Sequence, residues 1–583
     1  MGERVDGYVP LEDYAVLGDG RTVALVATDG RIDWLPTPSM HAPPVFAAVL
    51  DPPDGGFVEL RPEEPFTTSR RYLPGTPILE TTFRTAGGEV RVTDALNTDL
   101  PWTELVREVE GIAGEVPMRW EVRPGTRFGT AQPWSEPLGA GRGHLLHCGD
   151  QHLAVRHFDA GDPTTAPRAL AGRFRAGPGR RTLLALTVGD DGPIPLPGRA
   201  ELLGRRKATG DRWKAWPLAY RGPWQAEVRR SALMLKLLQF EPTGAIAAAA
   251  TTSLPERVGG DKNWDYRYMW VRDAAFAVDA LIRLGLHAEV HAGLSFLLRC
   301  ARSTAPHLKV FYDLDGEVPD AERELDAPGY RGSRPVRSGN EAAEQTQLGT
   351  FGHLLDAVRQ YVDAGHALDP PTGRLLADLA DRCCDQWANP DAGIWELHVN
   401  RHYTQSKMGC WVALDRAVRL HEQGQVPTTH VDRWRRERDL IHAWVDEHCW
   451  SGAKNSYTFY AGTEDLDAAT LLAGPFGFDR GDRLAGTLAA VERELSDGPL
   501  VYRYTGMREE EGAFVACSFW MVSALAILGR KEEATARMKD AVALANDVGV
   551  LSEQMAPDGH ALGNLPQAFS HLALINAVGA LLH

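Results

Sequence analysis

Cysteine is scarce in this sequence and is not arranged for metal binding or redox chemistry. The seven cysteines lie at positions 148, 300, 383, 384, 410, 449 and 517, and no two of them form a Cys-x-x-Cys pair. Cys383 and Cys384 are adjacent, which is too close for an ordinary disulfide. Since most of the seven lie within apolar segments, we expect buried, reduced thiols.

Long hydrophobic runs and an excess of positive charge are also missing. No window reaches 18 consecutive apolar residues, and the first ten residues, MGERVDGYVP, lack the basic and apolar pattern of a secretory signal. Acidic residues outnumber basic ones by 78 to 62, and the net charge of −16 argues against binding to nucleic acids or anionic membranes. We therefore expect a soluble, cytoplasmic protein without nucleic-acid or membrane partners, and the sequence is compatible with a homo-oligomer.

What remains is the composition of a globular protein with a surplus of tryptophan. Hydrophobic residues make up 44% and charged residues 24%, which excludes wholesale disorder, and glycine and proline show no three-residue period, which excludes collagen. The length of 583 residues predicts more than one domain. The 16 tryptophans predict either large cores or a site that stacks on flat ligand faces.

Residues 1–205 have the pattern of an antiparallel β-sandwich. Residues 22–26 and 31–35 flank Asp29-Gly30, a strong hairpin signal, and residues 78–84 and 89–92 flank a second glycine-rich turn. Further strands are predicted at residues 118–122, 144–146, 153–158 and 182–188. Many short strands without helices between them favour a β-sandwich.

From residue 224 onward, apolar residues recur every three or four positions, which indicates helices. The first helix begins at Trp224, and ten similar segments follow at residues 273–285, 287–302, 341–364, 372–388, 406–422, 431–448, 482–496, 513–529, 531–547 and 566–582. A weaker segment near residues 467–473 makes twelve. Twelve helices in residues 224–583 fit an (α/α)6 barrel with its site on the loops at one end, and the Arg-, Lys-, Gly- and Pro-rich residues 206–223 are predicted to be the linker.

Polar and aromatic residues are concentrated just before several of these helices. Residues 263–273, NWDYRYMWVRD, hold four aromatic residues, two arginines and two aspartates. Tryptophan faces pack against sugar rings, and arginine with aspartate binds their hydroxyl groups. A buried, salt-bridged helix start explains the same residues equally well.

Three other junctions share this character. In residues 393–396, GIWE, Trp395 can desolvate Glu396 and raise its pKa toward that of a usable proton donor, although an ordinary surface glutamate is the common alternative. Residues 551–555, LSEQM, contain Glu553, which only a closed fold could bring to Glu396. Residues 332–340 form a basic loop with Arg334, for which a solvated surface loop is at least as good an explanation.

These motifs resemble those of glycoside hydrolase family 15, the glucoamylase and glucodextranase family, in its bacterial and archaeal branch that contains trehalases. The resemblance runs through YAVLGDGRTVALVATDGRIDWL at residues 14–35, NWDYRYMWVRDAAF at 263–276, GYRGSRPVRSGNEAAEQ at 329–345, GIWE at 393–396 and LGNLPQAFSHLALINA at 562–577. It implies a β-sandwich followed by an (α/α)6 barrel and an inverting, exo-acting hydrolase of α-glucosidic bonds that releases β-glucose.

The resemblance also implies roles for particular residues. Glu396 matches the general acid and Glu553 the general base, whose carboxyl groups must be separated by roughly 6.5–9.5 Å to admit a water molecule. Arg272 and Asp273 match the residues that bind the terminal glucose. Further substrate contacts are implied or expected at a larger set of positions: Trp264, Trp270, Trp395, Arg334 and Arg503.

Trehalose is the expected substrate, because fungal glucoamylases carry a second acidic residue after the general acid and this chain has Leu397 there. The alternatives are a glucoamylase or glucodextranase acting on α-1,4 or α-1,6 glucans, a hydrolase specific for another glycoside, and a sugar-binding protein without catalysis. Residues 313–317, DLDGE, resemble a calcium loop but lack its later glutamate, so no metal and no cofactor are expected. Trp34 is a candidate contribution of the sandwich to the site.

Overall fold

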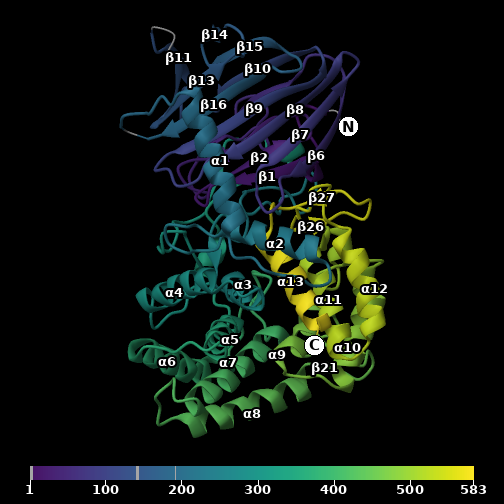
Figure 1. Cartoon of the computed structure of the whole chain (residues 1–583). Coiled ribbons are helices and arrows are strands. Elements are labelled where there is room, and N and C mark those ends of the chain that lie inside the picture. Colours follow the sequence, from purple (N-terminus) through teal and green to yellow (C-terminus); the bar gives the residue numbers. More distant parts are fainter. Residues whose placement is uncertain (1–3, 140–142, 191, 583) are drawn as a thin grey trace.

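The computed structural model describes residues 4–139, 143–190 and 192–582. A β-sandwich packs against one end of a helical barrel (Figure 1). One antiparallel sheet has the order β1 (Tyr14–Gly18), β2 (Val23–Ala27), β3 (Arg31–Pro36), β5 (Gly56–Pro62), β10 (Val116–Pro124), β15 (Ala169–Ala176), β14 (Thr164–Ala166), with β4 (Pro44–Phe46) beside β3. The other has the order β11 (Trp134–Pro137), β12 (His144–Cys148), β13 (Gln151–Phe158), β16 (Arg181–Gly189), β9 (Thr103–Gly114), β8 (Gly88–Leu96), β7 (Leu79–Thr85), β6 (Phe66–Tyr72).

The predicted hairpins are confirmed. Strands β2 and β3 pair antiparallel around Asp29-Gly30, and β7 pairs with β8 across the second turn. The long strand β9 was not predicted, because its charged residues hide its apolar pattern. Arg107 of β9 points into the sandwich, where it forms a fully buried ion pair with Asp94 at 2.8 Å.

Residues 206–215 of the predicted linker are helical instead. They belong to α1 (Arg199–Ala215), which lies along the outside of the second sheet (Figure 1). Arg205 and Arg206 pair with Glu104 and Glu108 of β9 at 2.6 and 2.7 Å, and Leu202 joins an apolar cluster with Val106. The basic residues therefore dock the helix onto an acidic strand, whereas the sequence pattern suggested a solvated connection.

The remaining helices agree with the twelve predicted segments. They are α2 (Gln225–Leu238), α3 (Val271–Arg283), α4 (His287–Ser303), α5 (Gly349–Asp363), α6 (Pro370–Gln386), α7 (Thr404–Glu422), α8 (Val431–His448), the 3-10 helix η4 (Ala468–Leu472) running into α9 (Ala473–Phe476), α10 (Asp482–Leu495), α11 (Val515–Ile527), α12 (Lys531–Val542) and α13 (Ala568–Leu582). Helix α5 begins later than predicted, because residues 341–344 form a separate 3-10 turn.

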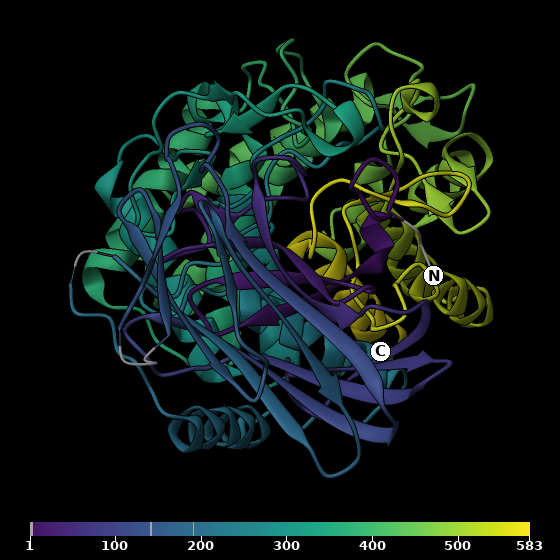
Figure 2. The ribbon, with the colours of Figure 1, turned by 90° about the horizontal axis from the view of Figure 1, so that it is seen from above.

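The helices form an inner and an outer layer, and Figure 2 shows them behind the strands of the sandwich. Contacts close an inner ring through α3, α5, α7, η4, α11 and α13, and α13 returns to α3. The outer helices α2, α4, α6, α8, α10 and α12 pack against this ring. Inner helices such as α11 and α13 are buried nearly all round, whereas α8 and α12 bury one face only, as expected for the two layers.

Short strand pairs shape the loops at the N-terminal ends of the inner helices. The pairs are β17 (Met269–Trp270) with β18 (Phe311–Tyr312), β19 (Arg323–Leu325) with β20 (Val336–Ser338), β21 (Trp450–Ser451) with β22 (Ser456–Tyr457), β23 (Ser496–Asp497) with β24 (Leu500–Val501), and the three strands β25 (Ala513–Phe514), β26 (Gln554–Met555) and β27 (Ala561–Leu562).

One apolar core continues from the sandwich into the barrel. Trp34 of β3 is fully buried and donates its indole N–H to the Ala250 carbonyl at 2.9 Å, so it joins the two parts and does not reach the site, contrary to expectation.

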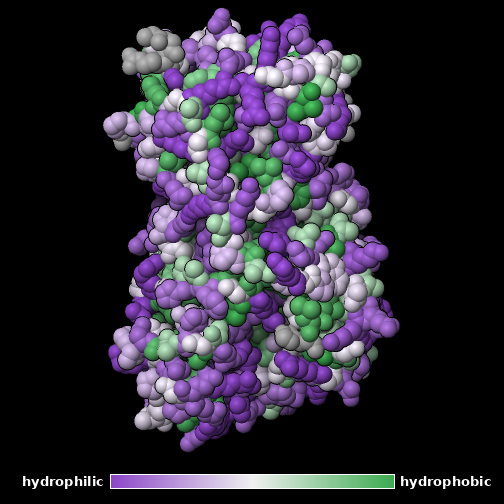
Figure 3. Space-filling model, viewed as in Figure 1, coloured by the Kyte–Doolittle hydropathy of each residue, from purple (hydrophilic) through white to green (hydrophobic). Residues whose placement is uncertain are grey.

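The face of the molecule in Figure 3 is mainly hydrophilic, with hydrophobic residues in small groups. Within the described ranges, no helix has the length and apolar character needed to cross a bilayer.

Candidate active site

Glu396 lies in a tight turn just ahead of the inner helix α7, and its backbone is strained. Its φ of 61° is in the left-handed region, which is costly for a residue with a side chain. Two contacts from distant segments hold the backbone of the turn: Gln345 donates to the Glu396 carbonyl at 3.0 Å, and Arg272 donates to the Ile394 carbonyl at 2.6 Å. A strained residue held from several sides is typical of a functional position.

The carboxyl group of Glu396 is almost removed from solvent, with 15% of its side chain exposed. Burial raises its pKa, the Arg272 guanidinium at 3.3 Å opposes this rise, and the negative charge of Asp273 adds to it. The carboxyl group therefore keeps a proton at higher pH than an exposed glutamate would, as a general acid requires.

Glu553 lies at the start of the loop that leads to α13 and is 1% exposed. Its Oε2 accepts the backbone N–H of Asn564 at 3.1 Å, and its Oε1 has no hydrogen-bond partner among the described residues. Gly563 must remain a glycine, because its φ is +71° and a Cβ there would lie 2.4 Å from Glu553 Oε2.

Burial raises the pKa of Glu553 to about 7. The Asn564 N–H and the Arg503 charge lower this pKa, and the negative charges of Glu511 and Glu396 raise it further. The structure therefore brings both predicted carboxyl groups into one buried centre. An inverting hydrolysis needs a protonated acid and an ionised base, so Glu553 must lose its proton before it can act as the base.

Arg272 and Asp273 begin the inner helix α3, and Asp273 accepts from Arg272 Nε at 2.6 Å. The Arg272 guanidinium also lies 5.1 Å from the Phe569 ring of α13. The pair is thus fixed between Glu396 and the interior of the barrel. Arg272 has further N–H groups, and Asp273 has further lone pairs, that can bind hydroxyl groups of a ligand.

Arg503 is also buried in the centre, in a network that the sequence did not indicate. It donates to Glu256 Oε2 at 2.8 Å and to Glu511 Oε1 at 2.5 Å, and Glu511 also binds Lys262 at 3.0 Å. Burial alone would raise the pKa of Glu511, but Arg503 and Lys262 together hold it below its ordinary value.

Of the predicted tryptophans, Trp270 and Trp395 are buried with their rings against protein, whereas Trp264 is half-buried. Trp270 is 0% exposed and stacks on Phe311 at 4.5 Å, so it is a packing residue behind the site and offers no free face to a sugar. Trp395 is 8% exposed and donates its indole N–H to Asp467 at 2.9 Å. The Arg337 guanidinium lies 4.5 Å from the Trp264 ring, and the Trp264 carbonyl accepts from Asn564.

Arg334 is exposed, and its charge acts on Tyr8 of the sandwich. Arg337, three residues later, is the arginine of this loop that is anchored near Trp264. Substrate binding by Arg334 therefore stays a prediction.

Two further residues belong to the centre and were missed by sequence reasoning. Tyr266 lies near both carboxyl groups, since burial and the charges of Glu553 and Glu396 raise the pKa of its hydroxyl well above the usual value. Glu256 contacts Arg503. Tyr266 could have been found within the aromatic run at 263–273, whereas nothing in the sequence near Glu256 distinguishes it from a surface residue.

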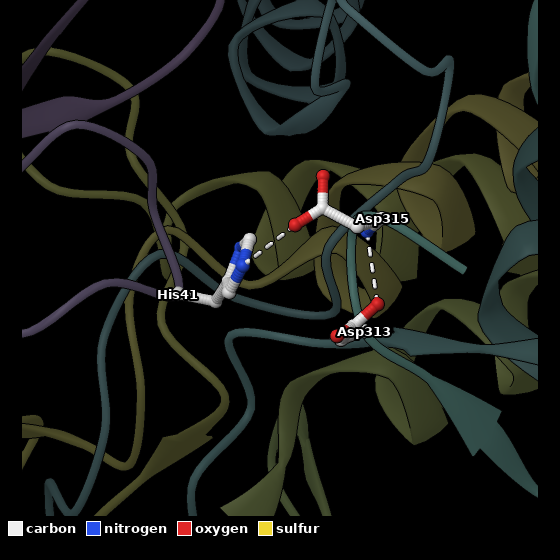
Figure 4. Close-up of side chains that lie close together, drawn as sticks. All are labelled: His41, Asp313 and Asp315. Atoms are coloured by element: carbon white, nitrogen blue, oxygen red, sulfur yellow. Dashed lines mark hydrogen bonds and ion pairs between the residues drawn. The ribbon is translucent and has the colours of Figure 1, made fainter. Parts of the chain in front are cut away.

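Within the described ranges, one group has the donor types and spacing that could hold a metal ion: His41, Asp313 and Asp315 (Figure 4). His41 Nε2 lies 3.3 Å from Asp315 Oδ2, which links a sandwich loop to a barrel loop. Asp313 Oδ1 accepts the backbone N–H groups of residues 315, 316 and 317 at 2.9, 2.7 and 2.9 Å. These contacts account for the loop geometry of residues 313–317 without a metal.

Two family models match the chain in consecutive segments. The model of glycosyl hydrolases family 15 matches residues 223–579, and a model described as trehalase-like, N-terminal, matches residues 3–137.

Similar proteins include trehalases. A trehalase of Mycobacterium tuberculosis is 35% identical over 98% of this chain and 89% of its own length, and one of Thermoplasma acidophilum is 31% identical over 94% and 97%. Among solved structures, a bacterial glucoamylase complexed with acarbose has a TM-score of 0.71 at 13% identity, over 99% of this chain and 95% of the other. At that identity, the structural match speaks for the fold: a sandwich followed by a helical barrel.

Proposed function

The chain belongs to glycosyl hydrolases family 15 and is a glycoside hydrolase, and we propose that it hydrolyses trehalose with Glu396 as general acid and Glu553 as general base. The observation that carries this proposal is the convergence of the two carboxyl groups in one buried centre beside Arg272 and Asp273. The full-length similarity to trehalases supports the choice of substrate.

The proposed reaction breaks the bond between the anomeric carbon of one glucose unit and the bridging oxygen. Glu396 gives its proton to that oxygen, while Glu553 takes a proton from a water molecule that attacks the same carbon from the opposite side. Arg272 and Asp273 bind hydroxyl groups of the glucose unit under attack. Tyr266 lies near both carboxyl groups and is placed to contact the ring as positive charge develops on it.

Inversion makes a distinct prediction for trehalose, whose two glucose units are joined through their anomeric carbons. The attacked unit leaves as β-glucose and the other keeps its α configuration, so the first products are equal amounts of the two anomers. Proton NMR recorded within seconds to minutes of mixing would measure this ratio. Two α anomers, or release of glucose from maltose, isomaltose or panose but not from trehalose, would contradict the proposal.

Substitution of the two carboxyl groups tests their roles separately. We expect Glu396→Gln and Glu553→Gln each to lower kcat on trehalose by about 10²- to 10⁴-fold, the usual contribution of a general acid or base. α-Glucosyl fluoride separates the two, because fluoride leaves without protonation: Glu396→Gln should keep much of its activity on this substrate and Glu553→Gln should not. Equal losses in both variants on both substrates would reject the assignment.

We place the reaction in the cytoplasm. All seven cysteines are free and buried, which fits a reducing compartment and the expectation from their spacing.

A further inference from the structure

Glu256 is a third carboxyl group in the active centre, and it has unused hydrogen-bonding capacity. The residue is 1% exposed, its Oε2 accepts from Arg503 Nη2 at 2.8 Å, and its Oε1 has no hydrogen-bond partner in the described part of the chain. An unpaired polar atom in a buried position costs free energy unless a ligand or water completes it. One oxygen of Glu256 is therefore available to a ligand or a water molecule.

The backbone fixes Glu256 next to the general base. Its carbonyl accepts from the Gly512 N–H at 3.0 Å, and the carbonyl of Pro255 accepts from the Gly563 N–H at 2.8 Å. The residue after Gly563 donates to the Glu553 carboxyl group. The segment of Gly563 and Asn564 therefore contacts both the residue before Glu256 and the carboxyl group of Glu553.

Neighbouring charges act on the carboxyl group of Glu256 in opposite directions. Burial raises its pKa well above the usual value, the Arg503 charge opposes this rise, and the negative charges of Glu511 and Glu553 add to it. The oxygen of Glu256 that lacks a partner can accept a hydrogen bond from a sugar hydroxyl group.

The centre contains two arginine clusters at different depths. Arg272 is the inner one, because the Phe569 ring beside it packs on Phe276 at 5.4 Å, and Phe276 lines a cavity of about 600 Å³ in the far half of the barrel. Arg503 belongs to the outer one. From Glu511 through Lys262 to Glu510, the exposure of the side chains rises from 0% to 29% and 58%.

We propose that Glu256 binds a hydroxyl group of the second glucose unit of the substrate, the one that leaves. An enzyme that attacks a terminal glucose holds that unit at the closed end of its pocket, here at Arg272, so the second unit must lie toward solvent, at the Arg503 cluster. The inference rests on the proposed trehalose hydrolysis and adds a specificity-determining residue on the leaving-group side.

The test compares two substrates that share the glucosyl group under attack and differ in the leaving group. Trehalose has a second glucose unit, whereas α-glucosyl fluoride has none. We expect Glu256→Leu, which keeps the volume and removes the polar atoms, to lower kcat/KM on trehalose by about 10- to 100-fold, mainly through KM, since a buried hydrogen bond is lost. Its kcat/KM on α-glucosyl fluoride should stay within about threefold of the native value.

Two further variants sharpen the result. Glu256→Gln can still accept a hydrogen bond, so it should recover most of the activity on trehalose that Glu256→Leu loses. Glu533→Gln is the matched control, because Glu533 also pairs with an arginine, Arg530, but is exposed on the outer helix α12. It should behave as the native protein on both substrates.

Equal losses on both substrates would overturn the inference, because they would place Glu256 at the base or at the first glucose unit. An unchanged KM for trehalose in Glu256→Leu would overturn it as well. If Glu256→Leu does not fold, Glu256→Asp takes its place, and its withdrawn carboxyl group must raise KM for trehalose alone. If the native protein hydrolyses α-glucosyl fluoride but not trehalose, the proposed function itself fails, which is a different result from a failure confined to the Glu256 variants.

Discussion

Two arginine–aspartate pairs in the segment 263–273 look alike in sequence, but the structure gives them different roles. Arg267 and Asp265 form a buried two-point ion pair at 2.8 and 2.7 Å, and Arg267 also donates to the Ala42 carbonyl of the sandwich. Arg272 and Asp273 face Glu396 instead. The salt-bridge interpretation of the motif therefore applies to Arg267 and Asp265, whereas sugar binding by Arg272 and Asp273 stays a proposal.

Glu553 also has a cost at the residue scale, because a buried carboxyl group with a raised pKa destabilises the fold when it ionises. Between its ordinary pKa of 4.5 and its folded pKa of about 7, the folded state keeps a proton that the unfolded state has released. This contribution to stability is complete below pH 4.5 and is lost as the pH rises through 7. We expect the melting temperature of Glu553→Gln to exceed that of the native protein more at pH 8 than at pH 5.

Differential scanning calorimetry at the two pH values measures this difference. The exposed Glu510→Gln variant is the control and should show no pH-dependent gap from the native protein. An equal gap at pH 5 and pH 8 would show that ionisation of Glu553 does not limit stability.

The same titration predicts that kcat/KM rises with pH through about 7, because the base must be ionised in the free enzyme.

At the scale of elements, the turn that carries Glu396 is the most constrained segment near the site. Gly393 has a φ of +72°, and a Cβ there would lie 2.8 Å from the Tyr403 ring. Three distant residues hold the turn: Gln345, Arg272 and Asp467, the last of which caps η4 and binds the Trp395 indole. Their combined contacts keep Glu396 in a conformation that costs about 1–3 kcal/mol.

Asp467 is therefore expected to position the acid without touching the substrate. Loss of its side chain in Asp467→Ala should lower kcat on trehalose about tenfold or more, because Trp395 is released and the strained turn relaxes. Asp467→Asn keeps the oxygen that accepts from Trp395 and from the Ala469 N–H, so it should stay within about threefold of the native kcat. Steady-state kinetics of both variants measure the effect, and equal kcat values in the two would show that the hydrogen bond is not what positions the acid.

At the scale of the whole molecule, the sandwich supports the loops of the barrel. Tyr8 and Tyr330 form reciprocal hydrogen bonds across the junction, at 2.7 Å to the Gly329 carbonyl and 2.8 Å to the Val9 carbonyl. Trp34 and the carbonyl of Ala42 make two more connections, to Ala250 and Arg267. The Ala42 contact holds the segment that leads into Arg272 and Asp273, so the sandwich contributes to the site through support.

We expect the barrel segment, residues 216–583, not to fold by itself. Its removal from the sandwich would expose the apolar surface that packs around Trp34 and would leave Arg267 without its carbonyl acceptor. Circular dichroism with thermal melting would measure this, with the full chain as control. A cooperative melt together with native kcat on trehalose would show that the sandwich is dispensable.

Much of the fold could be predicted from local patterns. The Asp29-Gly30 hairpin and the helical periodicity survive because turn residues and apolar spacing act within a few positions. Strand β9 and helix α1 were missed for one reason. Charged residues of the helix pair with charged residues of the strand, as Arg205 does with Glu104, and local patterns do not reveal a partner so far away in the chain.

By itself, the sequence determined the family and the two architectures and predicted the two carboxyl groups, because motifs and periodicity are written in consecutive residues. Only the tertiary structure decided which residues surround those carboxyl groups. It placed Trp34 and Trp270 in packing positions, left Arg334 at the surface, and brought Glu256 and Glu511 to Arg503. The physical reason is burial: the pKa of a glutamate and the availability of its oxygens depend on neighbours that closure of the helical ring brings together.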